Sequence, residues 1–424
     1  MKNLFTLLVL GISIVSNAQD SYLQCGTLFD TETGTSLSKK TVVVSGNRIK
    51  EIKDGFVAGG AEDLLVDLKD KVVLPGLIDM HVHLESEFDP KTYIKKFTGN
   101  DVDVAFEATV YAERTLMAGF TTVRDLGGSG VNIALRNAIN KGLVRGPRIL
   151  TAGKALASTG GHADPTNGMR KSLMGDPGPK EGVVNSPEDA RKAVRQRYKN
   201  GADVIKITAT GGVLSVAKSG QNPQFTLEEI KAITDTAKDY GFSVAAHAHG
   251  DEGMRLAILG GVSTIEHGTL MSEETMELMI QKKCYLIPTI SAGKQVAEKA
   301  KIPGFFPDVV AKKALDIGPK HQAAMARAYK KGVPMGFGTD AGVFPHGLNA
   351  IEFGYLKEAG IPVGESLKAA TVVNAKLLGM EDQIGRLEPG FFADIIAVAE
   401  DPIKNVKTLE QTVFVMKNGV VYKE

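Results

Sequence analysis

The feature of this 424-residue sequence that most limits its fold is an alternation, through its middle, of short β-branched segments with longer segments of helical spacing. Such alternation is typical of parallel βαβ units in an α/β protein. Eight parallel strands can close into a barrel, so the sequence predicts a (β/α)8 TIM barrel over residues 76–384. The segments with the composition of strands are residues 77–83, 121–125, 148–152, 204–207, 243–247, 264–267, 285–288 and 335–340.

Both ends of the chain have the pattern of strands joined by turns. Residues 41–44 and 48–52 flank a Ser-Gly-Asn turn, and residues 412–416 and 420–422 flank Lys417-Asn418-Gly419. Asn-Gly supplies the positive φ angles of a tight hairpin. We therefore expect residues 19–75 and 385–424 to form one small composite β-sandwich domain that clasps the barrel.

The N-terminus resembles a secretory signal. Lys2 precedes an apolar run over residues 4–15, and the small residues Ser16 and Ala18 occupy the positions that a signal peptidase inspects. We interpret residues 1–18 as a signal peptide that is cleaved, which predicts a periplasmic or secreted protein. The apolar run is shorter than the about 20 residues that span a bilayer, so we expect no stable membrane insertion.

Charge and cysteine content exclude some classes of partner and of fold. Lys and Arg number 50 against 49 Asp and Glu, and no run of like charge gathers in one place. Nucleic acid and anionic membranes are therefore poor candidates for partners, and a small-molecule partner is expected instead. With only Cys25 and Cys284 present, a disulfide framework is absent, and both thiols are expected to be buried and free.

Six residues with the chemistry of metal ligands fall at the expected carboxyl ends of strands, where barrel enzymes place their active sites. Alternate residues of a strand point to the same side, so His81 and His83 can reach one ion inside the barrel mouth. A lysine at the end of a buried apolar strand, as expected for Lys206, is unfavourable when charged. The alternative is a lysine that reaches the surface or pairs with an acid, which would leave one metal. The six residues are His81, His83, Lys206, His247, His267 and Asp340.

Several short motifs carry a resemblance to a known family. The motifs are His81-Val82-His83, residues 121–125, Thr159-Gly160-Gly161-His162, residues 201–206, His247-Ala248-His249-Gly250, Ile265-Glu266-His267-Gly268 and Gly338-Thr339-Asp340-Ala341-Gly342. Together they resemble the amidohydrolase superfamily, in its branch of imidazolonepropionase-related peptidases often named Xaa-Pro dipeptidases. The similarity runs over nearly the whole chain after residue 18, as far as residues 385–394.

This resemblance implies two divalent metal ions. In the family the lysine that matches Lys206 is carboxylated by carbon dioxide, and the resulting carbamate bridges both metals. By the same resemblance His247 and His267 complete the shell of the second metal, and Asp340 touches the first metal and handles the proton. Imidazole, carbamate and carboxylate suit zinc, although manganese, iron and cobalt accept the same ligand types.

The expected chemistry follows from charge. Two cations lower the pKa of a shared water, so a metal-bridging hydroxide is available to attack a carbonyl. Asp340 accepts the proton and delivers it to the departing amine. The sequence thus predicts a binuclear metal-dependent amidohydrolase that cleaves an amide bond of a dipeptide or an N-acyl amino acid.

Candidates for substrate contact are weaker. The resemblance gives His162 a role over the substrate carbonyl or carboxylate, although Ala163 stands where the family often has glycine. His249 lies two residues after His247 and is either a substrate-facing residue or merely structural. The loop of residues 211–215 is a further candidate.

Arg124 and His346 are also candidates, each with a structural alternative. Arg124 is as readily explained by a salt bridge to neighbouring acids, and His346 by an ordinary loop position. If the leaving residue of the substrate is cationic, Glu85, Glu87 or Asp164 would be expected to face it.

Two other functions stay open. One is hydrolysis of a cyclic amide such as an imidazolone, a hydantoin or a lactam, although Lys206 argues against imidazolonepropionase itself, which is expected to use one metal. The other is a binding module that has the barrel without the chemistry. The sequence leaves the oligomeric state open, although related barrels commonly form homo-oligomers.

Overall fold

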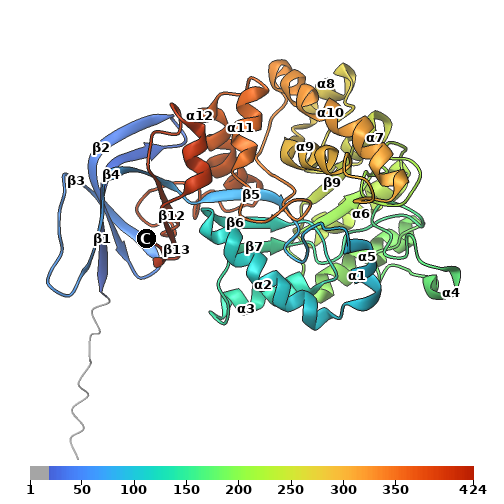
Figure 1. Ribbon diagram of the computed structural model, residues 1–424, viewed down its shortest axis with the longest axis horizontal. Helices are drawn as coiled ribbons and strands as arrows, with labels where there is room; N and C mark the ends of the chain where they lie inside the picture. The colour runs from blue at the N-terminus through green and yellow to red at the C-terminus, as the bar shows by residue number, and fades with distance from the viewer. Residues whose placement is uncertain (1–18) are drawn as a thin grey trace, which may run out of the picture.

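The computed structural model describes residues 19–424, which form a sheet at one end of the molecule and an α/β body at the other (Figure 1). The predicted signal peptide, residues 1–18, lies outside the described residues. None of the helices in the described part of the chain combines the length and the apolar character needed to cross a bilayer.

The sheet at the end of the molecule is built from both ends of the chain. It contains β1 (Asp20–Asp30), β2 (Thr35–Ser45), β3 (Arg48–Asp54), β4 (Leu64–Pro75), β12 (Ile395–Val398), β13 (Phe414–Lys417) and β14 (Val420–Lys423). The strand order is β14-β13-β12-β4-β1-β2-β3. Asn418 and Gly419 have φ of 50° and 75°, so the predicted hairpin between β13 and β14 is confirmed.

The structure has one seven-stranded sheet here in place of the two stacked sheets of a sandwich. The reason is that β4 pairs with β1 on one side and with β12 on the other, so the segments from the two chain ends share one ladder. The sheet is strongly curved, so that Ile49 N in the edge strand β3 donates to Phe391 O, shortly before β12, at 2.9 Å. It encloses its own apolar cluster, which includes Leu23, Val42 and Phe414.

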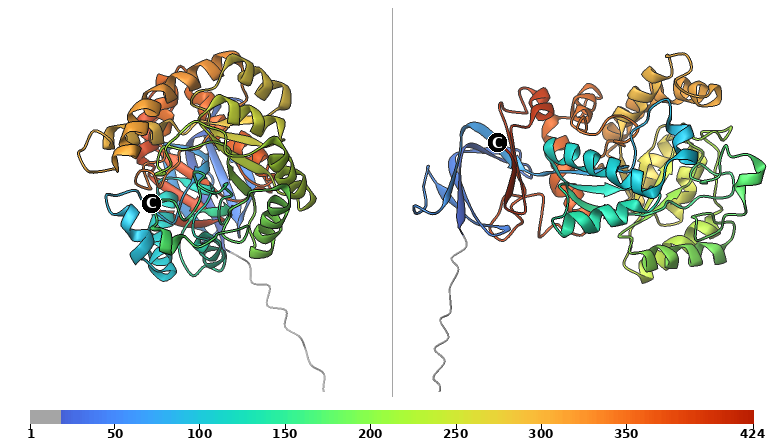
Figure 2. Two further views of the ribbon diagram at one scale, coloured as in Figure 1. Left: turned by 90° about the vertical axis from the view of Figure 1, so that its right-hand side faces the viewer. Right: turned by 60° about the horizontal axis from the view of Figure 1, so that its bottom comes forward.

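Two parallel sheets form the centre of the α/β body, which confirms the predicted α/β class with parallel strands. One sheet contains β5 (Leu77–Val82), β6 (Phe120–Asp125) and β7 (Arg148–Thr151). The other contains β8 (Ile205–Thr208), β9 (Val244–Ala248), β10 (Thr264–His267) and β11 (Tyr285–Ile287). Helices surround these strands (Figure 2).

The expected closed ladder of eight strands is not present, because residues 335–340 do not form a regular strand. Single parallel bridges, Val82–Ala341 and Leu286–Met335, join the segment to its neighbours, and Leu156–Ile207 joins the sheets on the other side. Side chains occupy backbone donors that a continuous ladder would use: Phe337 N donates to Asn374 Oδ1 and Thr339 N to Asp79 Oδ1, both at 3.1 Å.

The helices begin where the sequence supplies capping groups. Ser186 accepts a hydrogen bond from Asp189 N, and Thr226 forms a capping box with Glu229. The helices are α1 (Thr92–Thr98), α2 (Asp101–Met117), α3 (Val131–Asn140), α4 (Lys171–Met174), α5 (Pro187–Asn200), α6 (Leu227–Asp239), α7 (Asp251–Leu259), α8 (Glu273–Lys282), α9 (Ile290–Lys299), α10 (Asp308–Lys331), α11 (Ile351–Glu358), α12 (Val363–Lys368) and α13 (Asn374–Leu377), with a π turn over Ala369–Val373 and a 3-10 turn over Val406–Gln411.

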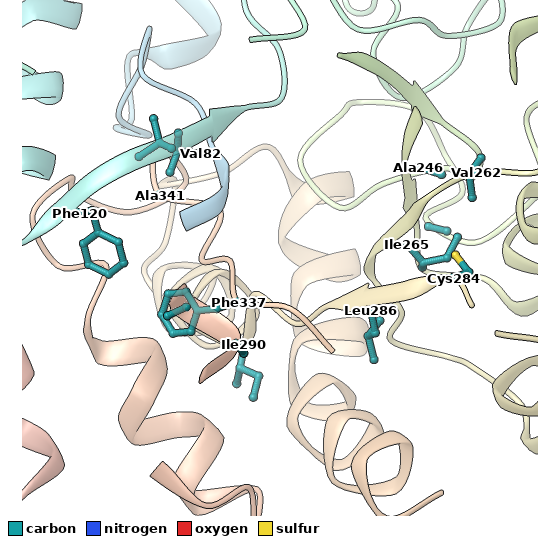
Figure 3. Packing of buried hydrophobic residues seen from close by; sticks show 14 of the residues in the cluster. Val82, Phe120, Ala246, Val262, Ile265, Cys284, Leu286, Ile290, Phe337 and Ala341 are labelled. Atoms are coloured by element: carbon teal, nitrogen blue, oxygen red, sulfur yellow. The ribbon is translucent and has the colours of Figure 1, made fainter. Parts of the chain in front are cut away.

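One large apolar core packs these helices on both parallel sheets (Figure 3). The Phe337 ring, from the irregular segment, stacks on Phe353 of α11 with centroids 4.3 Å apart and lies 5.9 Å from the ring of Phe120 in β6. Aromatic packing and backbone hydrogen bonds, such as Met80 N to Phe337 O at 3.0 Å and Gly336 N to Leu286 O at 2.9 Å, together hold the irregular segment in place without a continuous ladder. This positions Asp340, which ends the segment, beside the ends of β5 and β10.

Candidate metal centre

The structure brings together all six residues predicted as metal ligands. His81 lies in β5 and His83 directly follows it, while Lys206, His247 and His267 come from β8, β9 and β10. With Asp340 they line a cavity of about 740 Å³ at the carboxyl ends of the strands. A cavity of this size suits a small molecule.

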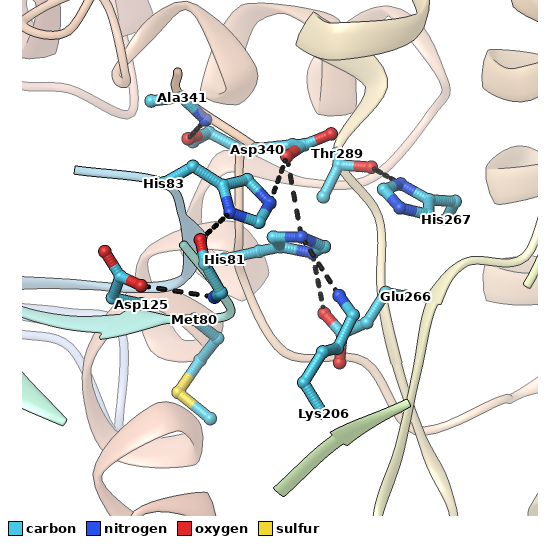
Figure 4. Close-up of polar contacts among 12 residues, drawn as sticks. Met80, His81, His83, Asp125, Lys206, Glu266, His267, Thr289, Asp340 and Ala341 are labelled. Atoms are coloured by element: carbon cyan, nitrogen blue, oxygen red, sulfur yellow. Dashed lines mark hydrogen bonds and ion pairs between the residues drawn. The ribbon is translucent and has the colours of Figure 1, made fainter. Parts of the chain in front are cut away.

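Asp340 is the centre of the first group of these side chains (Figure 4). Its Oδ1 lies 3.3 Å from His83 Nε2 and 3.5 Å from His81 Nε2, and it has no hydrogen-bond partner although it is buried. Lys206 Nζ lies 3.3 Å from the same nitrogen of His81. A buried oxygen that converges with imidazole nitrogens but accepts no hydrogen bond is the arrangement that a shared cation would satisfy.

A second group contains three imidazoles. His247, His249 and His267 each offer a nitrogen within 4.8 Å of the others, and the rings of His249 and His267 stack with centroids 5.0 Å apart. The ring of His249 thus lies only slightly farther from His267 than the ring of His247, whose centroid is 4.7 Å away. The structure places His249 among possible ligands as well as at the cavity wall.

The ring nitrogens that face away from the cluster are held by fixed partners. Such partners orient metal-binding histidines and set their tautomers. His267 and Asp340 also have left-handed φ of 74° and 61°, a strained conformation that is concentrated at functional sites. The pairs are His81 Nδ1 with Glu266 Oε2 at 2.9 Å, His83 Nδ1 with Gly127 O at 2.7 Å, His249 Nδ1 with Thr269 Oγ1 at 2.9 Å, and His267 Nδ1 with Thr289 Oγ1 at 2.7 Å.

Burial keeps most of these imidazoles neutral. Burial and the charge of Lys206 lower the pKa of His81 to about 4, and burial with neighbouring imidazoles lowers the pKa of His247 and His267 well below the usual value. Burial also lowers the pKa of Lys206 to about 8. Neutral imidazoles present lone pairs, so the centre is prepared for cations.

His162 lines the cavity. Its ring stacks on His247 with centroids 4.4 Å apart, and its Nδ1 has no hydrogen-bond partner. Burial, with the nearby charge of Lys313, lowers the pKa of His162 to about 3. A Cβ on Gly212 would lie 2.3 Å from His162 Cε1, so only glycine leaves room for this ring.

Arg124 and His346 do not line the cavity, and their contacts match the structural alternatives. Arg124 Nη2 donates to Glu266 Oε1 at 2.8 Å and Nε to Met80 O at 2.7 Å. His346 Nε2 lies 3.1 Å from the carbonyl oxygens of His83 and Ser86. Arg124 therefore holds Glu266, which in turn contacts His81, and His346 holds the segment that follows β5.

Three residues that the sequence did not single out belong to this region. Glu266 is buried between Arg124 and His81. The signal that could have found it is an acid next to His267 in a short strand between two helical segments. His321 of α10 contacts His267 O through Nε2 at 3.0 Å, and Lys313 of the same helix lies behind the loop of residues 211–217. Nothing local in a helical segment distinguishes these two from surface residues.

A parallel-stranded α/β fold with neutral imidazoles, a lysine and a carboxylate at its strand ends defines a class of protein that can hold metal ions. Within that class, the Amidohydrolase family matches residues 72–423, and the chain belongs to this family. This supports a hydrolase that acts on C–N bonds.

Three known proteins show how similar this chain is to its relatives. A Xaa-Pro dipeptidase, solved with methionine in its active site, is 50% identical and superposes with a TM-score of 0.93 over 96% of this chain and 100% of that protein. A prolidase solved with N-methylphosphonate-L-proline is 31% identical, with a TM-score of 0.87 over 96% and 100%. Ochratoxinase from Aspergillus niger is 31% identical over 372 residues, which are 83% of this chain and 76% of the relative.

Proposed function

We propose that this protein is a binuclear metal-dependent hydrolase that cleaves an amide bond of a dipeptide or an N-acyl amino acid. The observation that carries the proposal is the buried, unpartnered Oδ1 of Asp340, which faces the Nε2 atoms of His81 and His83. Membership of the Amidohydrolase family supports the reaction class. The names of the dipeptidase and prolidase relatives support a dipeptide as substrate.

Two divalent cations, zinc in our proposal, fit the residues present. His81, His83 and Asp340 would hold one ion, and His247 and His267 the other. Lys206 would bridge them as a carbamate, as in the imidazolonepropionase-related branch. Carboxylation needs a neutral amine, and burial, which lowers the pKa of Lys206 to about 8, makes the neutral amine more accessible at neutral pH than in an ordinary lysine.

When bound, the ions would lower the pKa of a shared water and polarise the substrate carbonyl. The protein's own groups would then move the protons. Asp340 accepts the proton of the attacking water and returns it to the leaving amine, because its carboxylate lies among the imidazoles at the centre of the site. His162, neutral at pH 7, can donate a hydrogen bond to the substrate carbonyl or carboxylate.

Further parts of the proposal concern architecture and location. The single bridges at both junctions of the parallel sheets support a (β/α)8 barrel, with residues 76–384 as the catalytic domain and residues 19–75 and 385–424 as the composite domain. We also propose a periplasmic or secreted location, which rests on residues 1–18.

Metal analysis and a substrate panel test the function. We expect two zinc ions per chain and hydrolysis of a dipeptide library by the zinc-loaded protein. Asp340→Asn should abolish turnover, whereas Asp316→Asn, at an exposed position of α10, should leave turnover unchanged. Turnover of a cyclic amide with inertness toward every dipeptide would favour the cyclic-amide alternative, and a folded, metal-free, inactive protein would favour a binding module.

A further inference from the structure

One side of the cavity is lined by apolar side chains. We call this set the apolar wall, and it comes from the segment after β5, the loop that follows β8, helices α9 and α10, and the segment after Asp340. Several of its members pack into a separate apolar cluster with Phe306 and Val310 of the same region. The apolar wall consists of Phe88, Val213, Leu214, Val296, Ile317 and Val343.

Glu85 and Glu87, two of the acids expected to meet a cationic substrate, line the cavity, but their carboxylates hold donors of the protein itself. Glu85 accepts hydrogen bonds from Ser129 N and Asn132 N at the start of α3. Glu87 accepts from His346 N at 2.8 Å and pairs with Arg114. These carboxylates hold backbone and side-chain donors, so the structure does not support the expectation that they bind a cationic residue.

Asp164 is engaged in the same way. Its carboxylate accepts from Gly160 N at 2.7 Å and from Thr166 N at 2.8 Å. It therefore shapes the loop that carries His162 and is not available to a substrate. Together with the apolar wall, this favours an uncharged substrate side chain.

Lys313 holds the loop that contributes Val213 and Leu214. This lysine of α10 is only 8% exposed, and its ammonium donates to three carbonyl oxygens. The acceptors are Gly212 O at 2.7 Å, Ser215 O at 2.6 Å and Ala217 O at 2.8 Å. Because an ammonium has three donors, these carbonyls saturate it.

A second contact holds the same loop. Tyr93 Oη donates to Leu214 O at 2.8 Å. Four carbonyls between residues 212 and 217 thus bond to side chains of α10 and α1, while Val213 and Leu214 line the cavity. The loop has no regular secondary structure, so its position depends on these contacts.

We propose that Lys313 is a positioning residue that clamps residues 211–217 as part of the apolar wall, and that this wall forms a subsite for an uncharged aliphatic side chain of the substrate. The proposal rests on the proposed function and names the substrate class of that site. Burial of a charged side chain against this wall would leave it unpaired, so charged substrates are selected against.

Kinetics on two dipeptide series test the subsite. The zinc-loaded full chain is assayed with Ala-Leu, Ala-Gly, Ala-Asp and Ala-Lys. A second series has the two residues exchanged: Leu-Ala, Gly-Ala, Asp-Ala and Lys-Ala. In one series we expect kcat/KM for the leucine peptide to exceed that for the aspartate and lysine peptides by about 100-fold. Equal turnover of charged and aliphatic peptides overturns the subsite and leaves the proposed function standing, whereas no turnover of any dipeptide or N-acyl amino acid overturns the proposed function.

Variants test the clamp. Lys313→Met should reduce kcat/KM for the leucine peptide by about tenfold, through KM, with little change for the glycine peptide. Lys313→Arg retains the cation and should lose less. Lys320→Met, an exposed lysine of the same helix, serves as the matched control. An unchanged KM in folded Lys313→Met contradicts the clamp.

A wall variant keeps the test decisive if Lys313→Met does not fold. Leu214→Asp leaves the backbone contact to Tyr93 available and places a carboxylate on the wall. It should reverse the preference, so that the lysine peptide is cleaved faster than the leucine peptide. Retention of the leucine preference in this variant would overturn the subsite.

Discussion

Glu266 links two buried side chains with different roles in the site. One carboxylate oxygen accepts from Arg124 and the other contacts His81 Nδ1. Burial alone would raise its pKa, but Arg124 and His81 outweigh burial and hold the pKa of Glu266 at about 2. The glutamate is therefore a permanent anion that fixes the His81 ring.

Replacement of Arg124 tests how much the ion pair between Arg124 and Glu266 contributes to the stability of the folded state. Arg124→Met leaves a buried carboxylate without its cation, so we expect a loss of about 3–5 kcal/mol in the free energy of unfolding. Urea denaturation followed by circular dichroism measures it. Arg145→Met, at an exposed ion pair, is the control and should change stability by less than about 1 kcal/mol.

In the proposed function, Lys206 is the residue that holds the second metal. Lys206→Ala removes the group that we propose as the bridging ligand, so activity should be abolished and bound zinc should fall below two ions per chain. Elemental analysis and dipeptide hydrolysis measure both. Lys199→Ala, exposed at the end of α5, should leave both unchanged, and wild-type turnover in Lys206→Ala would refute the bridging role.

Helix α9 begins at the edge of the site and is anchored there by α11. Glu352 of α11 accepts from Ile290 N at 2.8 Å and Ser291 N at 2.7 Å, which are free donors of the first turn. The residue before this turn, Thr289, has a left-handed φ of 60° and contacts His267 Nδ1. The start of α9 thus positions a candidate ligand.

This helix anchor predicts a pH dependence of stability. Burial, opposed by the Ser291 and Ile290 donors, raises the pKa of Glu352 to about 7 from 4.5. The folded state then binds the proton more tightly than the unfolded state. Its contribution to stability is full below pH 4.5 and is lost as the pH rises through about 7.

Thermal midpoints at pH 5, 6, 7 and 8 measure this effect. The midpoint of the wild type should fall with pH relative to Glu352→Gln, which cannot ionise. Glu365→Gln, exposed on α12, should follow the wild type. Parallel curves for wild type and Glu352→Gln would contradict the assignment.

At the scale of the whole molecule, Arg148 joins the terminal sheet to the α/β body. It begins β7, and its guanidinium donates to Asp394 Oδ2 and Asn418 Oδ1, both at 2.5 Å, and lies 4.7 Å from the centre of the Phe392 ring. These contacts lie at the amino end of a strand, whereas the candidate site lies at the carboxyl ends. The contacts that attach the terminal sheet can therefore be altered without a change at the candidate site.

Arg148→Lys should lower stability without loss of activity. Lysine cannot make both hydrogen bonds and the planar contact with Phe392, so we expect a loss of about 1–2 kcal/mol with kcat/KM retained. Denaturation and dipeptide hydrolysis measure the two quantities. Arg145→Lys is the matched control, and a large fall in kcat/KM would show that the terminal sheet supports the active site.

Much of the architecture could be predicted from local patterns. Alternating segments gave the parallel α/β class, and Asn418-Gly419 gave its hairpin. The irregular course of residues 335–340 could not be predicted, because it follows from Asn374 and Asp79, which occupy backbone donors from distant segments. The single curled sheet likewise depends on β4 pairing with strands from both chain ends.

The sequence by itself determined which ligand-type residues end the strands, because strand ends in parallel α/β folds converge and His81, His83, Lys206, His247, His267 and Asp340 are read directly from the chain. Only the tertiary structure decided the partners: that Arg124 faces Glu266 and not the cavity, that His249 joins the imidazole group, and that Lys313 saturates three carbonyls. Such contacts depend on the direction of side chains from separate elements, and local sequence does not encode that direction.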